Sequence, residues 1–204
     1  ESGRHLVENT IGQLNNDPSL TRNSIKSAVA SLTIGSGSAG ILLTHRRISK
    51  TQNRLVAAAV RADTAHHQLC QSGRDEAVGD GMQPIMNTDS EQLMRQGVDT
   101  GVATFAEFLN ETGWTREDID RSVCHQVGSA HRKLMLESLG LNVAKDFATF
   151  PRLGNTGSVA LPLTLAVAAS EGFVAAEQNV CLLGIGSGIN CLMLGIRWEE
   201  SRIL

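Results

Sequence analysis

The chain carries one short element twice, near its start and near its end. Residues 34–43 read IGSGSAGILL and residues 185–194 read IGSGINCLML, so that five of the ten aligned positions are identical. Each copy is a Gly-Ser-Gly turn followed by an apolar run. A nucleotide-binding fingerprint needs a helix after such a turn, whereas the residues after the second copy predict a buried strand. The repeat therefore indicates structural turns rather than a pair of phosphate-binding loops.

Composition narrows the class of protein. The 204 residues correspond to one domain or to a large fragment of a bigger fold, and the apolar share of 41% is sufficient for a core. The formal net charge of −3 gives no sign of a nucleic-acid-binding surface. No apolar run reaches the roughly 18 residues of a membrane-spanning helix, and no signal peptide is recognised. Four cysteines without CxxC spacing predict a reduced, cytoplasmic protein.

The first 90 residues mix helical, extended and irregular patterns. Spaced apolar residues predict a helix over 4–14, and residues 24–32 predict a short helical or turn segment. The apolar runs 38–44 and 55–61 predict two buried strands, which could pair antiparallel. Residues 64–88 are rich in Gly, Asp and His and predict a long surface loop, a kind of segment that is often functional.

Helices and strands alternate in the rest of the chain. A long helix is expected over 90–112, capped by Thr88 or Asp89 and stopped at Gly113. The elements expected after it are a short capped helix at 115–120, a strand at 122–127, helices at 130–139 and 156–170, and strands at 179–185 and 189–196. Such alternation predicts a layered α/β fold whose sheet is covered on both faces.

Two polar elements lie where function is common in α/β folds. His125 closes a short strand just before a helix, a position that suits catalysis and equally suits a histidine held by a local hydrogen bond. Asn155 lies between Gly154 and Gly157 and by itself is explained as a helix N-cap. If the two side chains converge, however, two neutral donors could hold a developing oxyanion or enolate.

The second Gly-Ser-Gly turn is a further candidate. Ser187 and Gly188 could present backbone N–H groups to a substrate, or they could form only a tight turn between strands. We expect no metal site, because the adjacent His66 and His67 have no cluster of further ligands. No nucleophile is evident either, since Cys124 and His125 should point to opposite faces of a strand.

Three motifs, in this order, resemble a known family. CHQVGSAH, LGNTGSVALPLTLA and LLGIGSGINCLMLGIRW look like the C-terminal half of thiolase-fold condensing enzymes. Within them, the chain is most similar to the β-ketoacyl-acyl-carrier-protein synthase III group and to its OleA-type acyl-CoA condensing enzymes. The resemblance implies a duplicated αβαβα layered α/β fold. Residues 1–55 would then be the tail of the first half and residues 56–204 the second half, with the two IGSG elements as corresponding pieces.

The resemblance also implies a chemistry. The family has a Cys-His-Asn triad, in which His125 and Asn155 match the last two members; the cysteine would lie upstream of this chain, which opens with ESGRHLVENT and no initiator methionine. The implied activity is Claisen condensation of acyl-CoA or acyl-carrier-protein thioesters by a dimer, without a further cofactor. Ser187 and Gly188 would contribute oxyanion N–H groups, and only this second IGSG copy, beside His125 and Asn155, would line a catalytic site.

Two alternatives to a condensing enzyme stay open at this point. The chain could be a non-catalytic subunit or half that dimerises with a catalytic enzyme or sets its chain length. It could also be an α/β module that binds a small molecule. An upstream cysteine would favour catalysis, and the placement of His125 relative to Asn155 would separate an oxyanion site from a binding module.

Overall fold

A mixed five-stranded sheet forms the centre of the protein. The computed structural model describes residues 3–21, 25–72 and 86–201 of the chain. Strands lie in the order β1 (Arg54–Ala62), β7 (Asn190–Trp198), β6 (Gln178–Gly186), β4 (Arg121–Cys124) and β5 (Asp146–Phe147). β4 runs parallel to both of its neighbours, whereas β7 is antiparallel to β1 and to β6. His125 directly follows β4 and therefore lies at the carboxyl end of the three parallel strands β5, β4 and β6.

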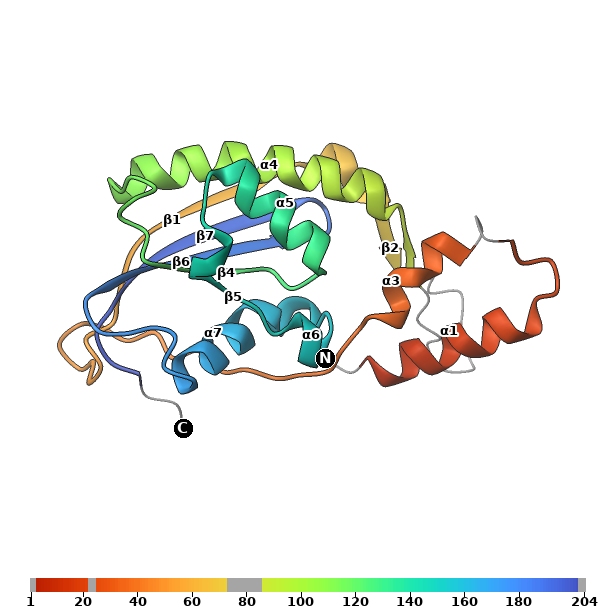
Figure 1. Cartoon of the computed structure of the whole chain (residues 1–204), viewed down its shortest axis with the longest axis horizontal. Helices are drawn as coiled ribbons and strands as arrows, with labels where there is room; N and C mark the ends of the chain where they lie inside the picture. The colour runs from red at the N-terminus through yellow and green to blue at the C-terminus, as the bar shows by residue number, and fades with distance from the viewer. Residues whose placement is uncertain (1–2, 22–24, 73–85, 202–204) are drawn as a thin grey trace.

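Helices cover both faces of this sheet. α4 (Ser90–Thr112) and α5 (Ser129–Leu139) lie above it in Figure 1, and α6 (Phe150–Leu153) and α7 (Ala160–Ser170) lie below. Each face has its own core cluster. The cluster under α4 and α5 includes Phe105, Phe108, Leu136, Leu183 and Met193, and the one facing α7 includes Val123, Val180, Leu182 and Trp198. This arrangement is the doubly covered α/β sheet that the alternating pattern predicts.

The helix limits confirm several local predictions. Asp89 caps α4 by accepting a hydrogen bond from the Gln92 amide (3.0 Å), and Gly113 ends the helix with φ of 70°. Gly140 ends α5 in the same left-handed conformation, with φ of 69°. A residue with a side chain is strained in this region, so glycine stops the helix at little cost. Within the described ranges, no helix has both the length and the apolarity needed to cross a bilayer.

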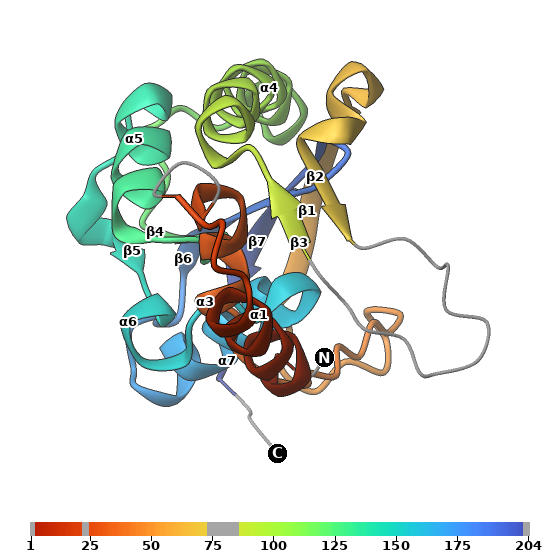
Figure 2. The ribbon, with the colours of Figure 1, turned by 90° about the vertical axis from the view of Figure 1, so that its right-hand side faces the viewer.

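The N-terminal segment extends beyond one end of the sheet. It consists of α1 (Arg4–Asn16), the 3-10 turn η1 (Lys26–Ala28) and α3 (Val29–Leu32), which Figure 1 and Figure 2 show in red and orange. The chain then runs back beneath α7 to reach β1. The remaining short elements are η2 (Thr64–Leu69), β2 (Cys70–Ser72), β3 (Met86–Thr88), η3 (Val143–Lys145) and η4 (Gly157–Val159).

The predicted strand at 38–44 is wrong. These residues form no strand, and Ile41, Leu42 and Leu43 are 72%, 87% and 79% exposed. β1, predicted over 55–61, does form, but it pairs with β7 instead, with Ala58 opposite Leu194. An apolar run becomes a strand only where a neighbour completes its backbone hydrogen bonds. The run itself does not reveal which neighbour is available.

Three further expectations need correction. Residues 115–120 form a turn rather than a helix, although Asp118 does accept hydrogen bonds from the Thr115 amide (2.7 Å) and hydroxyl (2.9 Å). The Asp120 amide donates to the Asn179 carbonyl of β6 (3.0 Å), so the chain leaves the turn in an extended conformation and enters β4 at Arg121. β4 ends at Cys124 rather than at residue 127. The expected loop 64–88 contains η2, β2 and β3, and its residues 73–85 lie outside the described ones.

The proposed division of the chain stays a prediction. The boundary between residues 55 and 56 falls inside β1, whose pairing with β7 starts at Arg54. The structure shows one five-stranded sheet in the described residues, and all five of its strands lie in residues 54–198.

Candidate active site

His125 lies at the carboxyl end of the parallel strands. Its amide donates a hydrogen bond to the Leu183 carbonyl (2.9 Å), which extends the β4–β6 ladder by one residue. The half-buried side chain borders a small cavity of about 50 Å³. The residues lining this cavity are His125, Gln126, Val127, Gly128, Ser129, Arg132, Ala148, Phe150 and Pro151. His125 thus stands between the end of the sheet and the start of α5, as predicted for a functional histidine.

The surroundings of His125 keep its imidazole neutral. Burial lowers the pKa of His125 from 6.5 to about 4, and the neighbouring His131 adds to this shift because two positive charges repel. Burial also lowers the pKa of His131, whose buried Nδ1 atom has no hydrogen-bond partner in the part of the chain that the structure describes. A neutral imidazole carries one N–H group, so His125 at pH 7 can donate a hydrogen bond to a developing negative charge.

We expect the free energy of unfolding to decrease as the pH falls from 6.5 to about 4. In this window the unfolded chain takes up a proton on His125 whereas the folded protein does not, so protonation favours unfolding. Once the pH is below both pKa values, this one histidine should have lowered the free energy of unfolding by roughly 3 kcal/mol. Urea unfolding near pH 7 and near pH 4.5 measures it. The variant His125→Gln should lose part of the dependence, and an unchanged dependence would contradict the buried, neutral state of His125.

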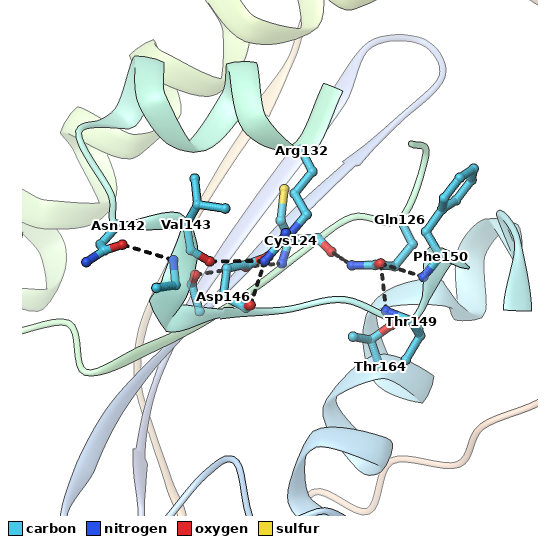
Figure 3. A network of polar contacts seen from close by, with 11 residues as sticks. Cys124, Gln126, Arg132, Asn142, Val143, Asp146, Thr149, Phe150 and Thr164 are labelled. Atoms are coloured by element: carbon cyan, nitrogen blue, oxygen red, sulfur yellow. Dashed lines mark hydrogen bonds and ion pairs between the residues drawn. The ribbon is translucent and has the colours of Figure 1, made fainter. Parts of the chain in front are cut away.

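A buried ion pair fixes the elements around His125. The Asp146 carboxylate, at the start of β5, has no exposed side-chain surface and accepts a hydrogen bond from Arg132 Nε of α5 at 2.6 Å. It also accepts from the Ser122 hydroxyl (2.8 Å) and from the Cys124 amide (3.0 Å) of β4. Figure 3 shows this network. Burial raises the pKa of Asp146, and Arg132, Ser122 and the Cys124 amide oppose the rise. The network joins β4, β5 and α5.

Asn155 follows α6 in a glycine-rich turn. Its Oδ1 accepts a hydrogen bond from the Gly157 amide (2.9 Å), as an N-cap does, and this orientation leaves the amide Nδ2 as the group that can donate. Its backbone forms a bridge to the first IGSG copy: the Asn155 amide donates to the Thr33 carbonyl (2.9 Å), and the Gly35 amide donates to the Asn155 carbonyl (2.8 Å).

The first IGSG copy is therefore part of the support for the Asn155 backbone, whereas the expectation that only the second copy lines a catalytic site stays a prediction. A Cβ atom on Gly35 would lie 1.8 Å from the Leu153 carbonyl oxygen, so this close approach requires glycine. The turn before Asn155 has the same requirement, since Gly154 has φ of 69°. The repeated glycines of the sequence indicated a close backbone contact, but the sequence did not indicate that Leu153 and Asn155 are the contact partners.

Ser187 and Gly188 form the turn between β6 and β7. Ser187 is exposed, and its carbonyl accepts a hydrogen bond from Asn190 Nδ2 (2.9 Å). Next to the turn, the backbone N–H and C=O groups of Ile189 both bond to Asp63 at 2.7 Å, which ties the turn to the end of β1. No hydrogen bond among the described residues joins His125, Asn155 and this turn to one another. The convergence of His125 and Asn155 on one oxygen atom, with this turn at a second oxygen, stays a prediction.

The cysteines of the chain are poor nucleophiles where they are buried. Burial raises the pKa of Cys124, Cys181 and Cys191, so their thiols remain protonated at neutral pH. Cys70 is half-buried in β2. Within residues 3–21, 25–72 and 86–201, no group of three or more His, Cys, Asp or Glu side chains could hold a metal ion. His66 instead lies 3.6 Å from the Asp63 carboxylate.

The polar residues that support the site were not predicted from the sequence. Gln126 and Arg132 line the cavity beside His125, and Asp146 accepts hydrogen bonds from Arg132 and from the Cys124 amide. Gln126 and Asp146 are buried. A polar residue inside an apolar segment is rarely buried unless it is hydrogen-bonded. The polar side chains of Gln126 and Asp146 among apolar neighbours could therefore have indicated a hydrogen-bonded role. Their partners became apparent only in the folded structure.

Comparison with known proteins supports the predicted resemblance. Residues 109–198 match the family described as 3-oxoacyl-[acyl-carrier-protein (ACP)] synthase III C terminal. An acyl-CoA:acyl-CoA alkyltransferase of Shewanella oneidensis is 39% identical over 97% of this chain. A second protein of this name, from Xanthomonas campestris, is 28% identical over 97% of this chain. A β-ketoacyl-[acyl-carrier-protein] synthase III of Streptomyces coelicolor is 25% identical over 62% of the chain.

Solved structures agree with this placement. A Xanthomonas campestris OleA variant with bound lauric acid and lauroyl-CoA superposes with a TM-score of 0.84 at 28% identity, over 95% of this chain and 55% of that one. The chain spans 57% and 56% of the length of the two alkyltransferases. The prediction of a thiolase-like α/β fold is confirmed. In sequence and in structure, the chain is similar to the C-terminal part of thiolase-fold condensing enzymes of the synthase III group, with OleA-type enzymes among its relatives.

Proposed function

We propose that the chain is the His- and Asn-bearing part of an enzyme that joins two acyl thioesters by Claisen-type condensation. The observation that carries this proposal is the neutral His125 at the end of β4, beside a cavity and in front of α5. This histidine lies in a chain that resembles an acyl-CoA:acyl-CoA alkyltransferase over 97% of the chain's own residues. Within the synthase III group, that similarity favours acyl-CoA as both donor and acceptor.

In the proposed reaction, a cysteine thiolate outside this chain first takes the acyl group from one thioester, and the leaving group departs as a thiolate that takes up a proton from water. The α-carbon of a second thioester then becomes an enolate, either by passing a proton to a carboxylate base of the complete enzyme or by losing carbon dioxide. His125 and Asn155 donate hydrogen bonds to the enolate oxygen, and backbone N–H groups at Ser187 and Gly188 hold the oxygen of the acyl-cysteine. Attack of the enolate carbon forms the C–C bond, breaks the C–S bond and returns the thiolate.

The chain's own contribution is electrostatic. A neutral donor stabilises a developing negative charge without neutralising a charge already present in the ground state, so it acts mainly on the transition state. Asn155 Nδ2 is held ready for this role because Oδ1 is occupied by the Gly157 amide. By the same resemblance, we propose that the complete enzyme is a cytoplasmic dimer without a further cofactor.

The proposal is tested by incubating the full-length enzyme with a single long-chain acyl-CoA, with and without malonyl-CoA, and analysing the products by mass spectrometry. We expect a β-ketoacyl product from the acyl-CoA alone, together with an acyl-cysteine adduct on the enzyme. Product formation only with malonyl-CoA would instead assign the decarboxylative reaction. If neither mixture yields a β-ketoacyl product, the enzyme is not a condensing enzyme and the non-catalytic alternative holds.

A further inference from the structure

Gln126 is a buried polar residue that the proposed chemistry does not use. It follows His125 directly, and only 2% of it is exposed. Its Nε2 donates a hydrogen bond to the Cys124 carbonyl (2.5 Å), and its Oε1 accepts from the amides of Thr149 and Phe150 (3.0 Å each). All three partners are backbone groups, as Figure 3 shows. The side chain therefore spans two separate segments of the backbone.

These two segments lead to the two proposed catalytic side chains. Cys124 is the last residue of β4 and precedes His125, while Thr149 and Phe150 begin the turn that continues through α6 to Asn155. The backbone ladder between β4 and β5 covers only the pairs Ser122–Asp146 and Val123–Phe147. Beyond Val123, β4 and the segment after β5 are no longer joined by backbone hydrogen bonds of the ladder. The side-chain amide of Gln126 joins them instead, through the Cys124 carbonyl on one side and the Thr149 and Phe150 amides on the other.

We propose that Gln126 is a positioning residue that holds the His125 segment and the segment leading to Asn155 at a fixed separation. The inference rests on the proposed function, since it assigns to Gln126 the spacing of the two oxyanion donors. A glutamine suits this task because its amide carries a donor at one atom and an acceptor at the other. Ionised glutamate lacks the donor, and leucine lacks both groups.

The variant Gln126→Leu should slow condensation by about 10- to 100-fold while KM and the rate of cysteine acylation change little, because misplaced donors weaken only the enolate step. It leaves three buried backbone groups without partners, so every assay is run at a temperature where the variant is folded. Gln126→Glu tests the geometry separately. A protonated carboxyl reproduces all three hydrogen bonds and an ionised one cannot, so this variant should be active at low pH and lose activity as the pH rises.

Thr164→Val is the matched control. The Thr164 hydroxyl hydrogen-bonds to the Thr149 hydroxyl at 2.6 Å, so the variant loses one buried hydrogen bond of the same segment while Gln126 keeps its contacts. We expect it to lower stability and to leave the condensation rate within about twofold of the original. If both variants lose the same free energy of unfolding and their condensation rates fall by the same factor, Gln126 has only a structural role and the inference is overturned.

A readout that does not depend on activity separates this inference from the proposed function. In Gln126→Leu, hydrogen exchange at the Thr149 and Phe150 amides should accelerate at least about 10-fold. The His125 imidazole, followed by NMR, should titrate closer to its ordinary pKa as its segment opens to water. If both occur in an enzyme that does not condense acyl-CoA, the proposed function fails and the positioning role stands. Unchanged exchange and titration would overturn the positioning role itself.

Discussion

Replacing Asn155 with alanine should slow the condensation step by about 100- to 1,000-fold and leave acyl-cysteine formation nearly unchanged. The physical reason is that Asn155 Nδ2 would donate to the enolate oxygen, an atom that carries charge only after the cysteine has been acylated. The acylated enzyme should therefore accumulate. Mass spectrometry of the intact enzyme after mixing with acyl-CoA measures the adduct, and product analysis in the same samples measures condensation.

Asn142→Ala is the matched control for this experiment. Asn142 Oδ1 accepts a hydrogen bond from the Ala144 amide at 2.9 Å, the same two-residue turn that Asn155 makes with Gly157. It lies before η3, away from the cavity beside His125. The control should lose a turn-stabilising bond and keep the condensation rate. If Asn155→Ala loses acylation together with condensation in a folded enzyme, the oxyanion role assigned to Asn155 is wrong.

Replacing Asp146 with alanine should lower the free energy of unfolding by about 3–5 kcal/mol. The carboxylate has no exposed surface, so its removal leaves the Arg132 guanidinium without its charge partner and leaves the Ser122 hydroxyl and the Cys124 amide without an acceptor. The Ser122 hydroxyl and the Cys124 amide have given up water in the folded state, as has most of the Arg132 side chain, and that penalty is no longer offset. Urea unfolding of the full-length protein at pH 7 measures the change.

The exposed pair Glu91–Arg95 provides the comparison for Asp146. Its N–O distance is 2.8 Å, close to the 2.6 Å of Arg132–Asp146, but its side chains are 73% and 69% exposed. Glu91→Ala should therefore change the free energy of unfolding by less than about 1 kcal/mol. A loss in Asp146→Ala no larger than the loss in Glu91→Ala would show that burial of the Arg132–Asp146 pair contributes nothing to stability.

Local signals account for the elements that were predicted well. The helix over 90–112 combines a capping Asp89, a periodic apolar face and a terminal Gly113, all of which act within a few residues of one another. The strands at 179–185 and 189–196 flank a short turn, so each finds its partner close by in the chain and they form β6 and β7. The position of His125 between β4 and α5 followed from the same kind of pattern.

Partners far apart in the chain account for the errors and omissions. Residues 38–44 have the composition of a strand and remain exposed, whereas β1 pairs with β7 more than 120 residues later. The glycines of the first IGSG copy were visible, but their contact with Leu153 and Asn155 was not. Gln126 and Asp146 likewise acquire their roles from backbone and side-chain groups that the fold brings to them.

The sequence by itself determined the α/β class, the limits of α4, the C-terminal end of α5, the order of the motifs and the candidates His125 and Asn155. These follow from caps, apolar periodicity and motif spacing, which act over a few residues or are preserved in the order of the chain. Only the tertiary structure decided which strands pair, which copy of IGSG supports Asn155, and that Asp146 and Gln126 hold the segments around His125. Those outcomes depend on satisfying buried hydrogen-bonding groups, and the partner of such a group is specified by the fold rather than by its neighbours in sequence.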